Sequence, residues 1–218
     1  QAGLLDIAAI PERYQQQALN DSYFTELKSE YQYLAHKFGL QAMDANQWRF
    51  LRLRPQNFPH IRIAQLAHLY YEQRAGLSQL LECESVKQVR ELLATQVTHY
   101  WETHYVFGEE SAKSEKKLSA ASLNLQIINT VTPILFAYGK HKNSEKYCER
   151  AFDFLETLKA EENHIVRMWK EVGLMVETAG DSQALIQLKK EYCDRKDCLR
   201  CRIGYEYLKG NSSIKGLG

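Results

Sequence analysis

Residues 118–139 contain no Asp, Glu, Lys or Arg, although charged residues make up 25% of the chain. The segment is about long enough to span a bilayer. However, seven Ser, Thr, Asn and Gln side chains between Ser119 and Thr132 would be costly in lipid. Its apolar residues form two stripes at helical spacing, Leu118, Ala121, Leu125, Ile128 and Leu135 on one side and Ile127, Val131, Ile134 and Tyr138 on the other. A helix that is apolar on two sides belongs inside a bundle, so we expect a buried central helix, which Pro133 kinks near Asn129.

Helical periodicity continues along most of the chain. One such stripe is preceded by Asp21, a residue suited to an N-cap, and followed by Gly39, a residue suited to a helix end; it consists of Phe24, Leu27, Tyr31, Leu34 and Phe38. Pro59 lies near the start of the next stripe, where a missing N–H has no cost. With only 11 Gly and 4 Pro, the chain has few breaks between helices. We therefore predict an all-α, multi-helix bundle with little or no strand.

Composition limits the classes of protein to which the chain can belong. Hydrophobic residues make up 44% of it, as in globular proteins, and the net charge of +1 excludes a surface coated in positive charge. Five cysteines in a chain of this size indicate reduced thiols in the cytoplasm. We expect a single helical domain over residues 1–218, with a candidate subdomain boundary near 108–117, and the start at Gln1 indicates a piece of a longer protein.

The segment from Ala45 to Tyr71 contains no acidic residue. It carries arginines interleaved with aromatic residues, and Pro55 and Pro59 hold the residues before them extended. An extended, arginine-rich lead into a helix N-terminus can bind phosphate or carboxylate through guanidinium and backbone N–H groups. The predicted anion or nucleic-acid site consists of Arg49, Arg52, Arg54, Asn57, Arg62 and Gln65. The alternative is that these arginines pair with acidic residues of neighbouring helices and lock the segment to the bundle.

Three of the five cysteines lie close together near the C-terminal end, at Cys193, Cys198 and Cys201. The Cys-x2-Cys half can present two thiolates to one metal, and Cys193 could supply a third. Soft thiolates favour zinc or an iron–sulfur cluster, although no nearby cysteine completes the set of four ligands. The alternatives are three reduced thiols that pack a tight turn, or a redox switch in which neighbouring basic residues lower the thiol pKa.

No catalytic residue is predicted. His99 and His104 lie five residues apart and share a helical face poorly, so packing explains them better than a metal site. Adjacent carboxylates at Glu161 and Glu162 are typical of a solvated helix face. The sequence contains no Walker loop, dinucleotide-binding glycine turn, nucleophile elbow or His-Glu-x-x-His motif. We therefore expect a non-catalytic chain.

Three motifs together resemble an uncharacterised bacterial family, the domain of unknown function 2851. They are the arginine-rich stretch from Trp48 to Ala67, Asn129 and Pro133 with Phe136 to Gly139, and Tyr192-Cys193 with Cys198 to Gly204. The opening residues from Gln1 to Leu5 resemble a mid-chain stretch of such proteins. The resemblance implies an intact protein of about twice this length, whose N-terminal half has a restriction-endonuclease-like fold. This helical half would then bind substrate or act as a scaffold.

A second resemblance is to helical DNA glycosylases of the endonuclease III type, which close with a four-cysteine iron–sulfur loop. This chain has three cysteines at that point, without a clear helix-hairpin-helix glycine motif or a catalytic Lys/Asp pair. The favoured hypothesis is a helical domain that positions DNA or RNA for a nuclease-like N-terminal domain of the same protein, without membrane contact. The competing hypotheses are a purely structural or protein-interaction domain and a metal-cluster domain of the glycosylase kind.

Overall fold

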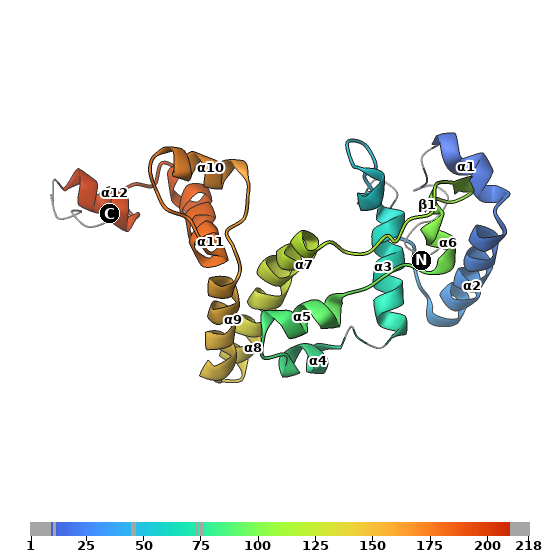
Figure 1. Ribbon diagram of the computed structural model, residues 1–218, viewed down its shortest axis with the longest axis horizontal. Coiled ribbons are helices and arrows are strands. Elements are labelled where there is room, and N and C mark those ends of the chain that lie inside the picture. Colours follow the sequence, from blue (N-terminus) through green and yellow to red (C-terminus); the bar gives the residue numbers. More distant parts are fainter. Residues whose placement is uncertain (1–9, 11, 45–46, 73, 75, 210–218) are drawn as a thin grey trace. The chain divides into compact units, whose positions relative to one another are not determined.

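The computed structural model describes residues 10, 12–44, 47–72, 74 and 76–209 (Figure 1). Its contacts divide the chain into two compact units, residues 1–83 with 87–123 and residues 84–86 with 124–218. The predicted all-α class is confirmed, because 64% of the residues are helical and the sheet consists of two short strands.

The first unit contains an aromatic core, to which several of its helices contribute. Its elements are α1 (Glu12–Leu19), α2 (Ser22–Phe38), a 3-10 turn (Pro55–Asn57), α3 (Pro59–Tyr71), α4 (Leu77–Glu82), most of α5 (Val86–Leu93), α6 (His99–Glu102), β1 (His104–Val106) and β2 (Glu109–Glu110). Trp101, Phe24 and Phe107 are fully buried. Helix α6 and the β1–β2 hairpin lie between α2 and α3 (Figure 1), since the ring of Trp101 contacts Tyr23 of α2 and His60 of α3.

Helix α2 begins and ends where the sequence predicts. The Asp21 carboxylate accepts a hydrogen bond from Phe24 N at 3.1 Å, which satisfies one of the unpaired N–H groups of the first turn. Gly39 closes the helix with a φ of 64°, a conformation that costs glycine little. Helix α3 starts at Pro59, in the predicted first turn. Local sequence rules therefore place these boundaries correctly.

The β1–β2 hairpin was not predicted as a separate element, and it depends on Gly108 at its tip. Gly108 has a φ of 74°, and a Cβ built there would lie 2.5 Å from the backbone oxygen of Gln17. Any larger residue would both strain the turn and push it away from α1. The hairpin can therefore pack closely on the α1–α2 corner only with glycine at this position.

Residues 111–117, within the predicted subdomain boundary, belong to the first unit. The Lys116 side chain is only 4% exposed, and its backbone oxygen accepts a hydrogen bond from Gln65 Nε2 at 2.7 Å. The contact-based division between the two units falls after Leu123. Residues 111–117 belong to the first unit because they are bonded to α3, which lies far from them in the sequence.

The second unit contains the rest of the uncharged helix and the C-terminal helices. Its elements are the end of α7 (Ala120–Gln126), a π-helical turn (Ile127–Val131), α8 (Thr132–His141), α9 (Glu145–Thr157), α10 (His164–Glu171), α11 (Ala179–Leu188), a second π-helical turn (Lys189–Cys193) and α12 (Arg202–Leu208). Helices α8 and α9 approach closely at Gly139: a Cβ built there would lie 2.7 Å from Cys148 Sγ and 2.9 Å from the backbone oxygen of Ser144.

The uncharged segment forms the predicted helix and is interrupted where predicted. The π-helical turn at Ile127–Val131 includes Asn129, four residues before Pro133, whose missing N–H leaves the regular bonding pattern open. Each of the two predicted apolar stripes is only partly buried: Leu135 and Ile127 are fully buried, whereas Leu125, on the stripe of Leu135, is 47% exposed and Ile134, on the stripe of Ile127, is 39% exposed. By length and composition alone, the helix Ala120–His141 could cross a membrane, a test that core helices of soluble proteins also pass.

Candidate nucleic-acid interface

Residues 49–54, here called the arginine turn, form a tight reversal ahead of α3. Leu53 N donates a hydrogen bond to the backbone oxygen of Phe50 at 3.3 Å, which closes a β-turn with Leu51 and Arg52 at its corner. Arg52 has a φ of 65°, at a position where type II turns favour glycine or asparagine. An arginine in the left-handed region is strained, and such outliers gather at functional sites.

This strain gives a stability prediction. Arg52→Gly is expected to be more stable than Arg52→Ala by about 1 kcal/mol, because only glycine adopts the left-handed conformation without a steric cost. Urea unfolding of the two variants measures the difference, and both have lost the same charge. Equal stabilities would show that Arg52 does not hold a positive φ in solution.

The three arginines of the turn are exposed, and none of the described acidic residues pairs with them. Arg49, Arg52 and Arg54 all lie in the exposed class. Within the part of the chain that the structure describes, none of the ion pairs involves these three side chains. Three guanidinium groups that make no ion pair with the described residues are therefore presented to solvent on one short turn.

Arg62 is held differently, by neutral groups in the first turn of α3. One of its terminal nitrogens donates to Asn57 Oδ1 at 2.6 Å and the other to Gln65 Oε1 at 3.0 Å. Burial lowers the pKa of the half-buried Arg62 guanidinium. Gln65, only 3% exposed, is itself fixed by its bond to the backbone of Lys116. Since a guanidinium has five N–H donors, Arg62 keeps donors for an external acceptor while its position is set.

The predicted site residues thus fall into three groups. Arg49, Arg52 and Arg54 are on the exposed turn, Arg62 is on α3, and Asn57 and Gln65 hold Arg62. The 3-10 turn Pro55–Asn57 joins the turn to the helix. The sequence identified this segment, but the partners that separate an exposed arginine from a paired one could only be found in the fold.

The arginine turn is anchored to the aromatic core through one side chain. The Phe50 ring centroid lies 5.5 Å from that of Phe58 and 5.1 Å from that of His60. His60 is fully buried, and its ring also contacts Trp101 and Phe107. No ring nitrogen of His60 has a hydrogen-bond partner among the described residues, and burial lowers its pKa to about 3. Sequence reasoning missed this residue, because a histidine beside a proline carries no local sign of burial.

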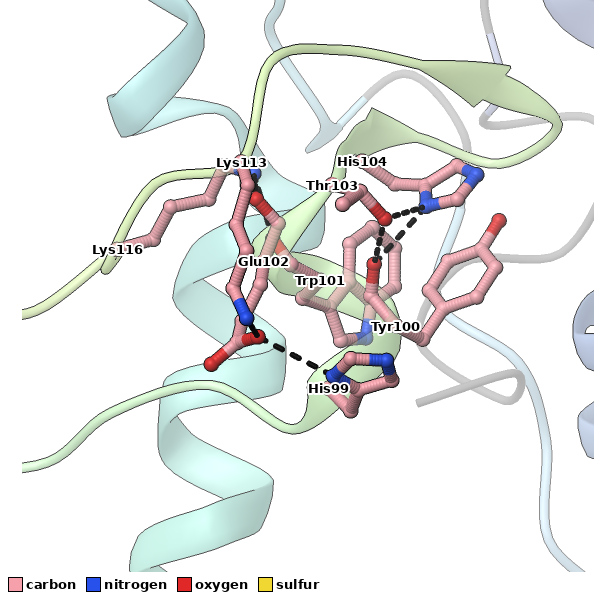
Figure 2. Close-up of polar contacts among 8 residues, drawn as sticks. All are labelled: His99, Tyr100, Trp101, Glu102, Thr103, His104, Lys113 and Lys116. Carbon is pink, nitrogen blue, oxygen red and sulfur yellow. Dashed lines mark hydrogen bonds and ion pairs between the residues drawn. The ribbon is translucent and has the colours of Figure 1, made fainter.

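Next to this core, the residues from His99 to Lys116 form a network of polar contacts (Figure 2). The Glu102 carboxylate accepts from Lys113 Nζ at 3.1 Å and from His99 Nδ1 at 3.2 Å, and Lys113 is the main cause of the lowered pKa of Glu102. Lys116 Nζ donates to the backbone oxygens of Trp101 and Glu102, at 2.6 and 2.9 Å. Burial lowers the pKa of Lys116, which acts here as a tie to α6.

The side chain of His99 is 89% exposed and does not pack, whereas His104 packs as the sequence predicted. Its ring is stacked on that of Tyr100, with centroids 4.0 Å apart, and its Nδ1 donates to the backbone oxygen of Tyr100 at 2.9 Å. Tyr100 in turn donates its hydroxyl to Asp21, and Gly108 N donates to the same Asp21 oxygen at 2.7 Å. A polar cleft of about 420 Å³ opens beside Asp21, Tyr100 and His104. Because Asp21 and Tyr100 are already bonded to each other, these groups mainly hold the hairpin on α2.

The three clustered cysteines lie at the start of the last helical segment. Cys193 ends the second π-helical turn, Cys198 is exposed, and Cys201, 8% exposed, precedes α12. All three are free thiols, and in the described residues no group of three or more His, Cys, Asp or Glu side chains is placed to hold a metal ion. A metal site at Cys193, Cys198 and Cys201 therefore stays a prediction.

Only Cys201 of the cluster is buried, whereas Cys193 and Cys198 are exposed, so two of the three thiols do not pack the turn. A Cβ built on Gly204 would lie 2.7 Å from the backbone oxygen of Cys198, so α12 lies directly against the loop. Local burial, followed by the neighbouring thiols of Cys201 and Cys198, raises the pKa of Cys193. This direction is opposite to the lowering that a redox switch driven by basic neighbours requires.

Comparison with known protein families gave one finding. The model of the family described as "Protein of unknown function (DUF2851)" matches residues 1–164. The match includes the arginine turn and the Asn129–Pro133 motif, whereas the cysteine cluster lies beyond it. Neither the curated proteins nor the solved structures gave a significant match.

Proposed function

We propose that this chain, which belongs to the DUF2851 family, binds nucleic acid through its arginine turn and the start of α3. In this proposal it is a non-catalytic helical domain of a larger cytoplasmic protein. It would position DNA or RNA for a nuclease-like domain of the same protein, as the family resemblance suggests. The exposure of Arg49, Arg52 and Arg54 without a carboxylate partner among the described residues is the observation that carries the proposal.

This observation favours binding over a structural role for a physical reason. An arginine that locks a loop to a bundle is expected to contact a carboxylate, because such pairs are its strongest hydrogen bonds. The three arginines of the turn make no such pair with the described residues, and the surrounding segment from Ala45 to Tyr71 contains no acidic residue. This segment therefore has no carboxylates that would repel a polyanion.

The start of α3 adds to the same local charge. The positive end of a helix dipole favours anions at its first turn. Helix α3 starts with Pro59, and Arg62 lies one turn in with its guanidinium held by Asn57 and Gln65. With a net charge of only +1 for the chain, binding would depend on this site and not on general basicity.

The test is the salt dependence of nucleic-acid affinity. The triple variant Arg49→Ala/Arg52→Ala/Arg54→Ala is expected to bind duplex DNA more weakly and with a shallower salt dependence. The slope of log K against log salt should fall by about 0.9 for each duplex phosphate that the variant no longer neutralises, or about 0.7 for each phosphate of a single strand. Fluorescence anisotropy with labelled DNA and RNA over a range of salt measures both the affinity and the slope.

A matched control removes the same charge elsewhere. Lys142, Arg167 and Lys190 are exposed, and they form no ion pair with the described residues. The variant Lys142→Ala/Arg167→Ala/Lys190→Ala should keep the natural slope, because these residues lie on helices and loops of the second unit. Equally weakened binding in both triple variants, or no measurable binding by the natural chain, would refute the proposed site.

A second candidate function is protein interaction, which the exposed apolar side chains of α2 support. Tyr33 and Phe38 are each 62% exposed, and Leu34 is 39% exposed. Large apolar side chains grouped on one surface mark interaction sites more often than isolated ones do. Under this hypothesis the arginine triple variant would bind its partner normally, and substitutions at Tyr33 and Phe38 would weaken binding.

A further inference from the structure

Leu51 stands at the corner of the arginine turn and is 85% exposed. Arg49 and Phe50 precede Leu51 in the chain, and Arg52 and Leu53 follow it. Leu53 is also exposed, to 41%. A single exposed leucine is common on protein surfaces. This one differs because it is the tip of a turn whose flanking side chains are arginines without a carboxylate partner among the described residues.

The turn is built to hold this tip in place. Phe50, the residue just before Leu51, packs its ring against Phe58 and the fully buried His60. After the corner, Arg54 is extended with a φ of −69° and a ψ of 145°, as Pro55 requires. Both ends of the turn are thus fixed, and ordering Leu51 on a ligand would cost little further conformational entropy.

Two features of the turn are unfavourable within the chain itself. Leu51 keeps its apolar surface in water, and Arg52 adopts a positive φ that side chains rarely take. Apolar wedges such as leucine are inserted between base steps by many proteins that bind duplex DNA, while basic residues hold the neighbouring phosphates. A rigid leucine corner flanked by exposed arginines has the form that such insertion needs.

We propose that Leu51 is a wedge that enters duplex DNA between two base pairs and partly unstacks them, while Arg49, Arg52 and Arg54 contact phosphates on both sides. The inference rests on the proposed function and adds the class of ligand: a duplex that can be opened at one step. Flexible pyrimidine–purine steps, mismatches and abasic sites are then bound better than stiff regular duplex.

Two measurements on the same chain test the wedge. A duplex with 2-aminopurine beside a central TA step should brighten when the protein binds, because unstacking relieves its quenching. A duplex with a mismatch at that step should bind about tenfold more tightly than the matched one, since about one step of stacking is already disrupted. Leu51→Ala should abolish the brightening and reduce the preference to about one, with the fold checked by circular dichroism.

Matched variants separate the roles of the side chains. Leu77→Ala removes a leucine that is 49% exposed on α4, and it should leave both measurements unchanged. The arginine triple variant should bind matched and mismatched duplex more weakly to the same extent, since it removes phosphate contacts and not the wedge.

The remaining outcomes would overturn either the wedge alone or the wedge together with the proposed function. Binding without brightening, or brightening that persists in Leu51→Ala, overturns the wedge and leaves the arginine site standing. Failure of the natural chain to bind any duplex or single strand overturns the proposed function and the wedge with it. Leu51-dependent binding to vesicles with anionic lipid, without DNA unstacking, would assign the same corner to a membrane surface and overturn the proposal.

Discussion

Replacing Asp21 with alanine is expected to lower the free energy of unfolding by about 3 kcal/mol, because one carboxylate serves three donors. One oxygen caps α2 through Phe24 N, and the other accepts from Gly108 N and from the hydroxyl of Tyr100. Burial, together with the Asp21 hydrogen bond, raises the pKa of Tyr100, so this hydroxyl stays protonated and remains a donor. Loss of the carboxylate removes the cap and leaves the half-buried hydroxyl without its acceptor.

Asp21→Asn separates the two parts of this effect. Asparagine keeps a capping oxygen, but its amide places a donor where Gly108 N–H needs an acceptor. It should therefore be about 1 kcal/mol more stable than the alanine variant and still less stable than the natural chain. Urea unfolding followed by far-ultraviolet circular dichroism measures all three. Equal stability of natural and alanine forms would show that the hairpin is not held on α2 through Asp21.

Replacing His60 with phenylalanine is expected to stabilise the protein at neutral pH by about 1–2 kcal/mol, since an unpaired buried polar group is costly. His60 is fully buried among Phe50, Trp101 and Phe107, and neither ring nitrogen has a partner in the described residues. Phenylalanine keeps the ring contacts and removes both nitrogens. Thermal and urea unfolding at pH 7.5 measure the gain.

The same substitution should change how stability depends on pH. The pKa of His60 is lowered to about 3 in the folded chain, whereas unfolding restores its ordinary value near 6.5. The unfolded chain therefore binds the extra proton between these values, and stability falls as pH decreases below 6.5. From pH 6.5 to 5 the loss is about 2 kcal/mol from this residue alone.

The pH range can be chosen so that the effect of His60 on stability is measured separately from that of the carboxyl groups with lowered pKa values. Glu102 and Asp181 have lowered pKa values, so their stabilisation is lost only below the ordinary range of carboxylates. Unfolding measured from pH 7.5 to 5 avoids most of that range. In His60→Phe the decrease in unfolding free energy as pH falls should be smaller, by the uptake of up to one proton on unfolding. An unchanged pH dependence would show that His60 is accessible to protons in the folded chain.

Only part of the candidate site in the arginine segment could be predicted from the sequence. The absence of acidic residues from Ala45 to Tyr71 identified the segment, and Pro59 identified the start of α3. Whether each arginine was paired could not be predicted, since that depends on which helices pack nearby. The fold leaves Arg49, Arg52 and Arg54 exposed and gives Arg62 two neutral partners, Asn57 and Gln65.

Sequence patterns correctly predicted the all-α class, the ends of α2 at Asp21 and Gly39, and the interruption near Asn129 ahead of Pro133. These features follow from groups within about one helical turn of each other, so local rules are sufficient. Only the folded chain shows that Asp21 also accepts from Gly108, 87 positions away, and that Lys116 is buried and bonded to Gln65, 51 positions away. Hydrogen bonding and desolvation between such distant segments depend on which surfaces meet, and no local pattern in the chain encodes that.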